Sequence, residues 1–246
     1  ADGGPTALAD NLTRIREEAE DAVRAGGGHI VLTDQHQGAD RVPMPMILAT
    51  SAVHSWLTRK GLRTFCSVGV RSAECIDPHY FAVLIGCGAT VVNPYLAEDS
   101  LADRIERGLL DGSLTDAVQK YREAVDQGLL KIMAKMGISV ISSYRGGLNF
   151  EAVGLSRAMV AEYFPGMTSR ISGIGVSGIQ RKVEDVHARG WRTGRMSCPS
   201  AASTRRASRA RPTRGKRPRC TCFRRRVTVP AMSCGNSIPP RCGPTR

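Results

Sequence analysis

The sequence contains no uninterrupted run of about 18 apolar residues, the length that a transmembrane helix requires, so we predict no membrane span. The first residues, ADGGPTALADNL, include neither a basic segment nor an apolar one, so we expect no secretory signal peptide. An initiator methionine is also missing. The lack of a membrane span and of a signal peptide favours a cytoplasmic location.

Acidic residues are missing from the last part of the chain. Residues 191–246 hold 15 of the 35 Lys and Arg residues and none of the 22 Asp and Glu residues. The other 190 residues are nearly neutral, so the net charge of +13 belongs to the C-terminal tail alone. This tail is rich in Arg, Pro and Ser and has no apolar periodicity, so we expect it to be disordered.

Metal-binding patterns are also scarce. Cys66, Cys75 and Cys87 lack metal-site spacing and are expected to be buried thiols in a reducing compartment. A C-x-C pair without a C-x-x-C partner is weak evidence for zinc. The tail has five cysteines: Cys198, Cys220, Cys222, Cys234 and Cys242.

The most informative stretch is GLLKIMAKMGISVISSYRGG, residues 128–147. Its first half has helical spacing of apolar residues, and Gly137 is expected to end that helix in a left-handed conformation. Ile138–Ile141 is mostly β-branched and is predicted to be a buried strand. Ser142, Ser143 and Tyr144 would then lie at the carboxyl end of that strand, where α/β folds bind ligands. On these grounds alone, an ordinary core unit with a polar loop is the favoured interpretation.

Helical and strand patterns alternate along the rest of the chain, which favours an α/β fold with parallel strands and crossover helices. HIVLT at His29–Thr33, Leu62–Val70 and Ala89–Val92 are the predicted strands before residue 128. Ser100 and Ser113 are predicted helix N-caps. Further helices are expected near Met46–Lys60 and Phe150–Val153.

Several polar residues follow the predicted strands and are candidates for a site. Asp34 and His36 follow the first strand and could reach a ligand or tunnel, but a solvated loop is the favoured interpretation because a lone Asp/His pair is common in loops. Asn93, Pro94 and Tyr95 follow the third strand. Glu74 and Asp77 are paired carboxylates, which can do acid–base work, but nothing here supplies the apolar pocket that would raise the pKa of one of them, so loop or helix-capping roles are favoured. His54 is a single helical histidine, which is more often structural than a ligand.

One further pattern is G-x-G-x-x-G at Gly173, Gly175 and Gly178. A dinucleotide site requires a strand directly before this pattern and an acidic residue about twenty positions after it. Met167–Ile171 is a poor strand pattern, and no acidic residue follows Asp185. We therefore do not predict a dinucleotide site here.

Four segments together resemble the large subunit of glutamate synthase, in its central domain and the start of the linker to its FMN domain. They are AVHSWLTRKGLRT (52–64), KIMAKMGISVISSYRGG (131–147), FEAVGLS (150–156) and YFPGMTSRISGIG (163–175). NPY at 93–95 also matches, whereas Ser55 and Trp56 stand where the family has further histidines. The resemblance covers about residues 8–178, and with the missing Met it suggests a fragment that starts inside a larger protein.

The resemblance implies a partial, degenerate (β/α) barrel-like domain over residues 1–180, followed by the tail at 181–246. The family makes glutamate from glutamine and 2-oxoglutarate, with FMN, an iron–sulfur cluster and NADPH or ferredoxin. The part present would be a scaffold and ammonia-channel wall between the amidotransferase and FMN domains. We expect it to bind no cofactor or metal, to contain no catalytic residue and to be inactive alone. Expected partners are the other domains of the large subunit, and the small subunit or ferredoxin.

The basic tail has more than one interpretation. We favour translation in a shifted frame, beginning near residues 181–194, because GC-rich codons read out of frame give Arg, Pro, Ala, Ser, Gly, Cys and Thr. The alternative is a small α/β binding protein whose tail binds nucleic acid, although interleaved aromatic residues and a recognition fold are lacking. A separate barrel enzyme is disfavoured, since about half of the necessary strands are present.

Overall fold

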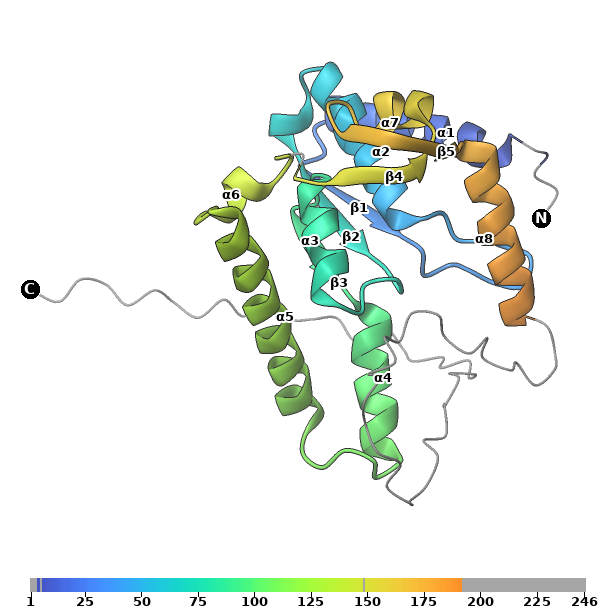
Figure 1. Ribbon diagram of the computed structural model, residues 1–246. Helices are drawn as coiled ribbons and strands as arrows, with labels where there is room; N and C mark the ends of the chain where they lie inside the picture. Colours follow the sequence, from blue (N-terminus) through green and yellow to red (C-terminus); the bar gives the residue numbers. More distant parts are fainter. Residues whose placement is uncertain (1–3, 5, 148, 192–246) are drawn as a thin grey trace, which may run out of the picture. The chain divides into compact units, whose positions relative to one another are not determined.

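The computed structural model describes residue 4 and residues 6–147 and 149–191, which form helices and short parallel strands (Figure 1). Residues 192–246 lie outside the described residues, so the predictions for the tail stay predictions. The helices are α1 (Ala7–Arg24), α2 (Met46–Arg59), α3 (Pro78–Gly86), α4 (Tyr95–Glu106), α5 (Leu114–Met136), α6 (Ile141–Tyr144), α7 (Arg157–Tyr163) and α8 (Val176–Trp191), with a 3-10 turn, η1, at Arg63–Phe65. The strands are β1 (His29–Thr33), β2 (Ser67–Arg71), β3 (Val91–Asn93), β4 (Glu151–Leu155) and β5 (Thr168–Ile174).

The first three strands form a parallel sheet in the order β1-β2-β3. Helix α2 connects β1 to β2, and α3 connects β2 to β3, so each connection is a crossover of the kind that parallel strands require. All three strands therefore end at the same edge of the sheet. This edge brings together the residues that follow each strand.

Helices α1, α2, α3 and α5 supply the side chains that pack against one face of this sheet. Val68 and Val70 of β2 contribute to the two buried clusters on that face. The opposite face carries Val31, Gly69 and Val91 in register across the three strands. Val31 is 64% exposed and Val91 is 60% exposed, so no described residue covers this row.

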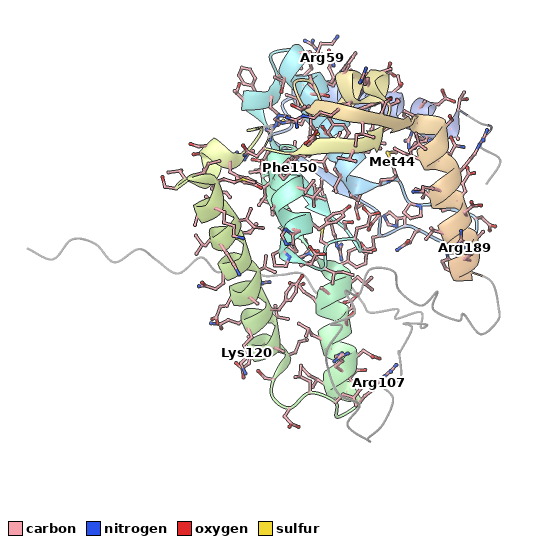
Figure 2. All side chains as sticks on the ribbon, in the orientation of Figure 1. Met44, Arg59, Arg107, Lys120, Phe150 and Arg189 are labelled. Atoms are coloured by element: carbon pink, nitrogen blue, oxygen red, sulfur yellow. The ribbon has the colours of Figure 1, made fainter. Side chains whose placement is uncertain are left out.

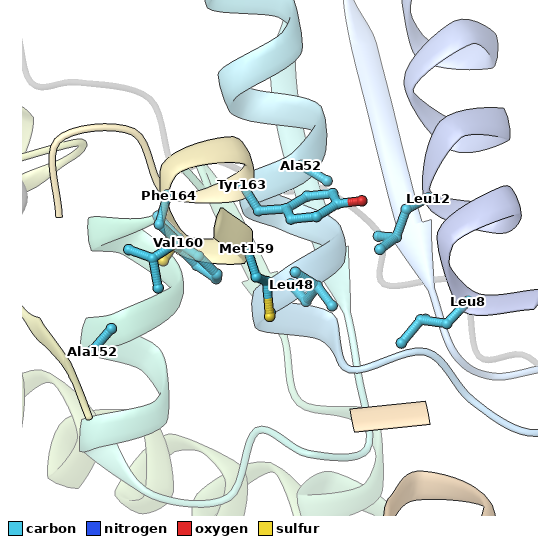
Figure 3. Close-up of a cluster of buried hydrophobic side chains, with 10 residues drawn as sticks. Leu8, Leu12, Leu48, Ala52, Ala152, Met159, Val160, Tyr163 and Phe164 are labelled. Atoms are coloured by element: carbon cyan, nitrogen blue, oxygen red, sulfur yellow. The ribbon is translucent and has the colours of Figure 1, made fainter. Parts of the chain in front are cut away.

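A second sheet consists of β4 and β5, which are parallel and connected by α7. A cluster of buried side chains joins this unit to the first one: Leu8 and Leu12 of α1 and Leu48 of α2 pack with Met159 and Tyr163 of α7 (Figure 3). The predicted α/β fold with parallel strands is thus confirmed. The described strands do not close into a barrel.

Four predictions of secondary structure were wrong in whole or in part. The strand predicted at Leu62–Val70 begins only at Ser67, because Arg63–Phe65 forms the 3-10 turn η1. Ile138–Ile141 is not a strand: residues 138–140 have no regular structure, and Ile141 begins α6. Val140 and Ile141 are exposed, and neither belongs to a strand of the two described sheets. Phe150–Val153 is not a helix, because Glu151–Leu155 forms β4, and the segment judged a poor strand forms most of β5. These two strands pair with each other, a long-range contact that local patterns do not show.

Helix ends follow the expected local chemistry in most places. Gly137 ends α5 with φ 71° and ψ 23°, as predicted for a left-handed C-terminal residue. Ser113 is the N-cap of α5, where its hydroxyl accepts a hydrogen bond from the Asp116 N–H. Ser100 is not a cap: α4 begins at Tyr95, and the Ser100 hydroxyl donates to the Leu96 carbonyl one turn earlier.

Candidate functional site

The carboxyl edge of the first sheet is held together by Asp34, which follows β1. Its carboxylate is buried and accepts hydrogen bonds from the Ser72 hydroxyl at 2.7 Å and from the Ala73 N–H at 3.0 Å, both just past the end of β2. Both partners are hydrogen-bond donors to a charged group, which makes these contacts stronger than neutral ones. Asp34 therefore fixes the loop after β2 relative to the end of β1.

Tyr95, from the predicted NPY segment, lies at the same edge. The guanidinium of Arg71 is 5.5 Å from the centre of the Tyr95 ring, and the Gln37 amide donates to the Tyr95 hydroxyl at 3.4 Å. Burial, together with the nearby Asp34 carboxylate, raises the pKa of the Tyr95 phenol, so the hydroxyl keeps its proton at neutral pH. The structure thus brings the residues after β1 and β3 together, as expected for parallel strands.

A hollow of about 650 Å³ opens beside this edge, between α1, the segment that follows β1, and α8. The Leu8 N–H donates to the Gln180 side chain at 3.1 Å, and His187 pairs with the Gly38 carbonyl at 2.8 Å, so α8 is attached on both sides of the hollow. Met44 also lines it (Figure 2). Its polar lining residues are Asn11, Arg14, Thr33, Asp34, His36, Gln37, Arg41, Gln180 and Glu184.

Glu74 and Asp77 have the local roles that were the alternative to acid–base catalysis. Asp77 caps α3, with its carboxylate accepting from the Tyr80 N–H at 2.9 Å. Glu74 accepts from the Met46 N–H at 3.0 Å and from the Tyr80 hydroxyl. Both carboxylates hold backbone segments in place.

The hydroxyl cluster at residues 142–144 is not at the sheet edge, because the predicted strand before it does not form. Tyr144 is 1% exposed, and its ring packs edge-on against Phe150 with the centroids 6.1 Å apart. Figure 2 labels Phe150, which lies near α6 and α3. Tyr144 is a core residue.

The G-x-G-x-x-G segment does lie between a strand and a helix, since β5 ends at Ile174 and α8 begins at Val176. Its glycines nevertheless serve internal packing. A Cβ on Gly173 would be 2.2 Å from the Gly154 carbonyl oxygen in β4, and one on Gly178 would be 2.9 Å from Ile174. These close internal contacts give no support to a phosphate cradle.

His54 on α2 forms the centre of a second arrangement. The Arg63 guanidinium donates to His54 Nδ1 at 2.9 Å and also reaches the Cys66 and Gly88 carbonyls. Because Nδ1 accepts this bond, the ring proton is on Nε2. Burial, with further repulsion from Arg63 and Arg145, lowers the pKa of His54 to about 4, so the ring is neutral at pH 7.

His54 lines a second hollow, of about 380 Å³. Its Nε2 lies on the side of Gly146, another lining residue, since a Cβ on Gly146 would be 3.6 Å from that nitrogen. One face of α2 supplies the polar wall of this hollow, at positions spaced by three and four residues; the opposite wall comes from α3, the loop after α6 and the loop after α7. The α2 residues are Ser51, His54, Ser55, Thr58 and Arg59. The prediction of a merely structural His54 missed this hollow, although the polar stripe in an otherwise apolar helix was a usable signal.

Within residues 4, 6–147 and 149–191, few other groups could bind a metal ion or act as a nucleophile. The described part holds no group of three or more His, Cys, Asp or Glu side chains that could bind a metal ion. Cys75 and Cys87 are buried as predicted, and burial raises the pKa of each thiol to about 12. None of the described helices has both the length and the apolar character needed to span a membrane.

The fold is an α/β domain in which the residues at the carboxyl edge of the first sheet form hydrogen bonds with one another. The sequence profile of the glutamate synthase central domain matches residues 2–156, so the chain belongs to the glutamate synthase central-domain family. The resemblance predicted from the sequence is confirmed.

Curated relatives agree with this assignment. The chain is 59% identical over 199 residues to the glutamate synthase [NADPH] large chain of Azospirillum brasilense, covering 80% of this chain and 13% of that protein. It is 42% identical to the corresponding Bacillus subtilis large chain and 38% identical to ferredoxin-dependent glutamate synthase 2 of Synechocystis, covering 73% and 75% of this chain and 12% and 13% of those proteins. The chain therefore spans about an eighth of the length of these relatives.

Proposed function

We propose that this chain serves as a structural scaffold within a glutamate synthase and forms part of the wall of an ammonia passage between an amidotransferase domain and an FMN domain. The family match over residues 2–156 is the observation that carries this proposal. We further propose that residues 1–180 form the domain and that residues 181–246 are a separate tail. The reaction served is the synthesis of glutamate from glutamine and 2-oxoglutarate in the cytoplasm.

The state of the polar side chains supports a scaffold role. The carboxylates of Asp34, Glu74 and Asp77 accept hydrogen bonds from backbone N–H groups and hydroxyls of the domain. They are therefore not available as general bases. The Cys75 and Cys87 thiols stay protonated at neutral pH and are poor nucleophiles. A passage wall needs shape and the exclusion of water, and it can work without a reactive group.

Cofactors and partners follow from the same assignment. FMN, an iron–sulfur cluster and NADPH or ferredoxin would act in other parts of the large chain or its partners, and this chain would bind none of them. The described residues contain no metal-binding cluster. Gly173 and Gly178 are in close contact with Gly154 and Ile174, which leaves no space for a phosphate group beside them. The remaining domains of the large chain, and a small subunit or ferredoxin, are the proposed partners.

Two measurements test the proposal. The purified chain should show no flavin absorption and no glutamate synthase activity, and a flavin band near one equivalent would contradict the proposed lack of cofactor. In a chimera, residues 2–156 replace the matching segment of the A. brasilense large chain. Glutamine-dependent glutamate synthesis should be retained; loss of it in a folded chimera that keeps glutamine hydrolysis and ammonia-dependent synthesis would show that this segment does not support ammonia transfer.

A second candidate function rests on the charge of residues 191–246, which hold 15 basic and no acidic residues. Such a segment binds nucleic acid through phosphate contacts that weaken steeply with salt. A gel shift that disappears when residues 191–246 are deleted would favour this function. The shifted-frame interpretation of the tail is tested by sequencing the surrounding DNA for a family-like continuation in another frame.

A further inference from the structure

Helix α2 is the most buried helix of the domain, yet one of its faces is entirely polar. Leu48, Ala52, Val53 and Leu57 are each at most 3% exposed on its other sides. Polar side chains on such a helix cost free energy unless their hydrogen-bonding groups find partners. The hydrogen-bond partners of these side chains show which donors and acceptors remain available to a bound molecule.

The hydroxyl groups of this face are already satisfied. Ser51 donates to the Tyr163 carbonyl at 2.6 Å, Ser55 donates to the Ala52 carbonyl at 3.2 Å, and Thr58 donates to the His54 carbonyl at 2.7 Å. Each hydroxyl has one proton, so toward the hollow these groups can only accept.

Unlike the hydroxyls, the side chains of His54 and Arg59 keep N–H donors that no described residue accepts. His54 receives its bond from Arg63 at Nδ1, so the N–H at Nε2 remains, and no described residue accepts from it. Arg59 uses Nη2 for the Glu162 carbonyl at 2.7 Å, which leaves the rest of its guanidinium for another acceptor. Figure 2 labels Arg59 at the outer side of α2. The hollow therefore has donors at its floor and at its rim.

The charges around the hollow all have one sign. Arg59 lines it, while Arg63 and Arg145 are close enough to His54 to lower its pKa. No Asp or Glu is among the described lining residues. A cation is therefore disfavoured in this space, and an anion is favoured.

The opposite wall is apolar, with Phe164, Pro165 and Met167 from the loop after α7. An inorganic anion would leave these side chains without a contact, whereas a short hydrocarbon chain would cover them. A volume of about 380 Å³ lies within the range of small-molecule sites.

We propose that this hollow binds a small organic carboxylate, which accepts hydrogen bonds from His54 Nε2–H and from Arg59 and packs its hydrocarbon part against Phe164 and Met167. The site is separate from the sheet edge and does not depend on the proposed scaffold role. Carboxylates of this size include short fatty acids, 2-oxo acids and amino acids.

Thermal unfolding of the full chain tests this, since a ligand that binds only the folded state raises the melting temperature in a saturable way. The probes are sodium butyrate, sodium chloride at equal ionic strength, butanol and sodium phosphate. We expect a saturable rise with butyrate that exceeds the effect of the other three. Arg59→Gln, an exposed substitution that leaves the core unchanged, should weaken butyrate binding about tenfold, as expected for the loss of a hydrogen bond to a charged group.

Arg24→Gln, an exposed change of the same charge on α1, is the matched control and should leave binding unchanged. His54→Gln keeps a donor near the Nε2 position and should retain more binding than His54→Phe. The proposal is overturned if chloride or butanol gives the same rise as butyrate, or if Arg59→Gln and Arg24→Gln behave alike. A rise that depends on Arg59 with phosphate but not with butyrate would overturn the carboxylate assignment.

Discussion

Arg63 donates a hydrogen bond of 2.9 Å to Nδ1 of His54. No described acidic side chain is hydrogen-bonded to this histidine, so the bond from Arg63 fixes the orientation of its ring. The guanidinium cannot give up its proton, so a second proton on Nδ1 would break the bond and place two cations side by side. Folding therefore selects the neutral ring.

The pH dependence of stability follows from this contact. The His54 pKa is about 4 in the folded chain, below its ordinary value of 6.5, so the unfolded chain binds more protons between these two values. Stability should be independent of this group above pH 6.5, fall as the pH drops toward 4, and level off below 4. Urea unfolding between pH 7.5 and 3.5 measures the slope, and His54→Gln should make it shallower; an unchanged slope would contradict the assignment.

Gly88 makes room for the same ring. Its φ is 108°, and a Cβ there would lie 2.2 Å from His54 Nδ1, so Gly88→Ala adds a clash to the backbone strain. We expect a loss of about 3 kcal/mol or more, from strain and overpacking together. Gly26 has a similar φ of 92° with open space around it, so Gly26→Ala should cost only the strain, about 1–2 kcal/mol. Equal losses in the two variants would show that the ring does not occupy this position.

Asp34 is expected to stabilise the sheet edge through the loop after β2. In Asp34→Asn the charge is lost, and one side-chain atom becomes a donor facing the Ser72 hydroxyl and the Ala73 N–H. We expect a loss of about 1.5–3 kcal/mol in the free energy of unfolding, the range for hydrogen bonds to charged groups. Asp126→Asn, on the exposed side of α5, is the control and should change stability by less than about 0.5 kcal/mol.

Two serines that looked alike in the sequence should differ when replaced. Ser113 caps α5, so Ser113→Ala should cost about 1 kcal/mol of stability. Ser100 lies inside α4 and donates to the Leu96 carbonyl, and such a bond adds little to a helix, so Ser100→Ala should be close to neutral. Chemical denaturation of both variants checks this, and equal losses would indicate that α4 begins later than at Tyr95.

Local chemistry allowed much of the fold to be predicted. Gly137 marks the end of α5 because only glycine adopts a left-handed conformation without strain, and HIVLT forms β1 with the predicted ends. Asp34 and Tyr95 meet because parallel strands end at one edge. The pairing of β4 with β5 could not be predicted in this way, since each strand exists through its contact with the other.

In the candidate site, too, some features follow from local sequence patterns and others depend on long-range packing. The polar residues after β1 and β3 could be placed from the alternation of helices and strands. The contact between Arg63 and His54 could not, because Arg63 lies in a 3-10 turn that was predicted to belong to a strand. The hollow beside His54 also depends on the loops after α6 and α7, whose positions follow from long-range packing.

The uncovered row of Val31, Gly69 and Val91 has a practical consequence for anyone who handles this domain. Parallel sheets are normally covered on both faces, so two copies in concentrated solution can bury these valines against each other. Light scattering should then show particles that grow with protein concentration and shrink when Val31 and Val91 are both replaced by threonine. Dilute samples are therefore the ones to use for spectra of this domain.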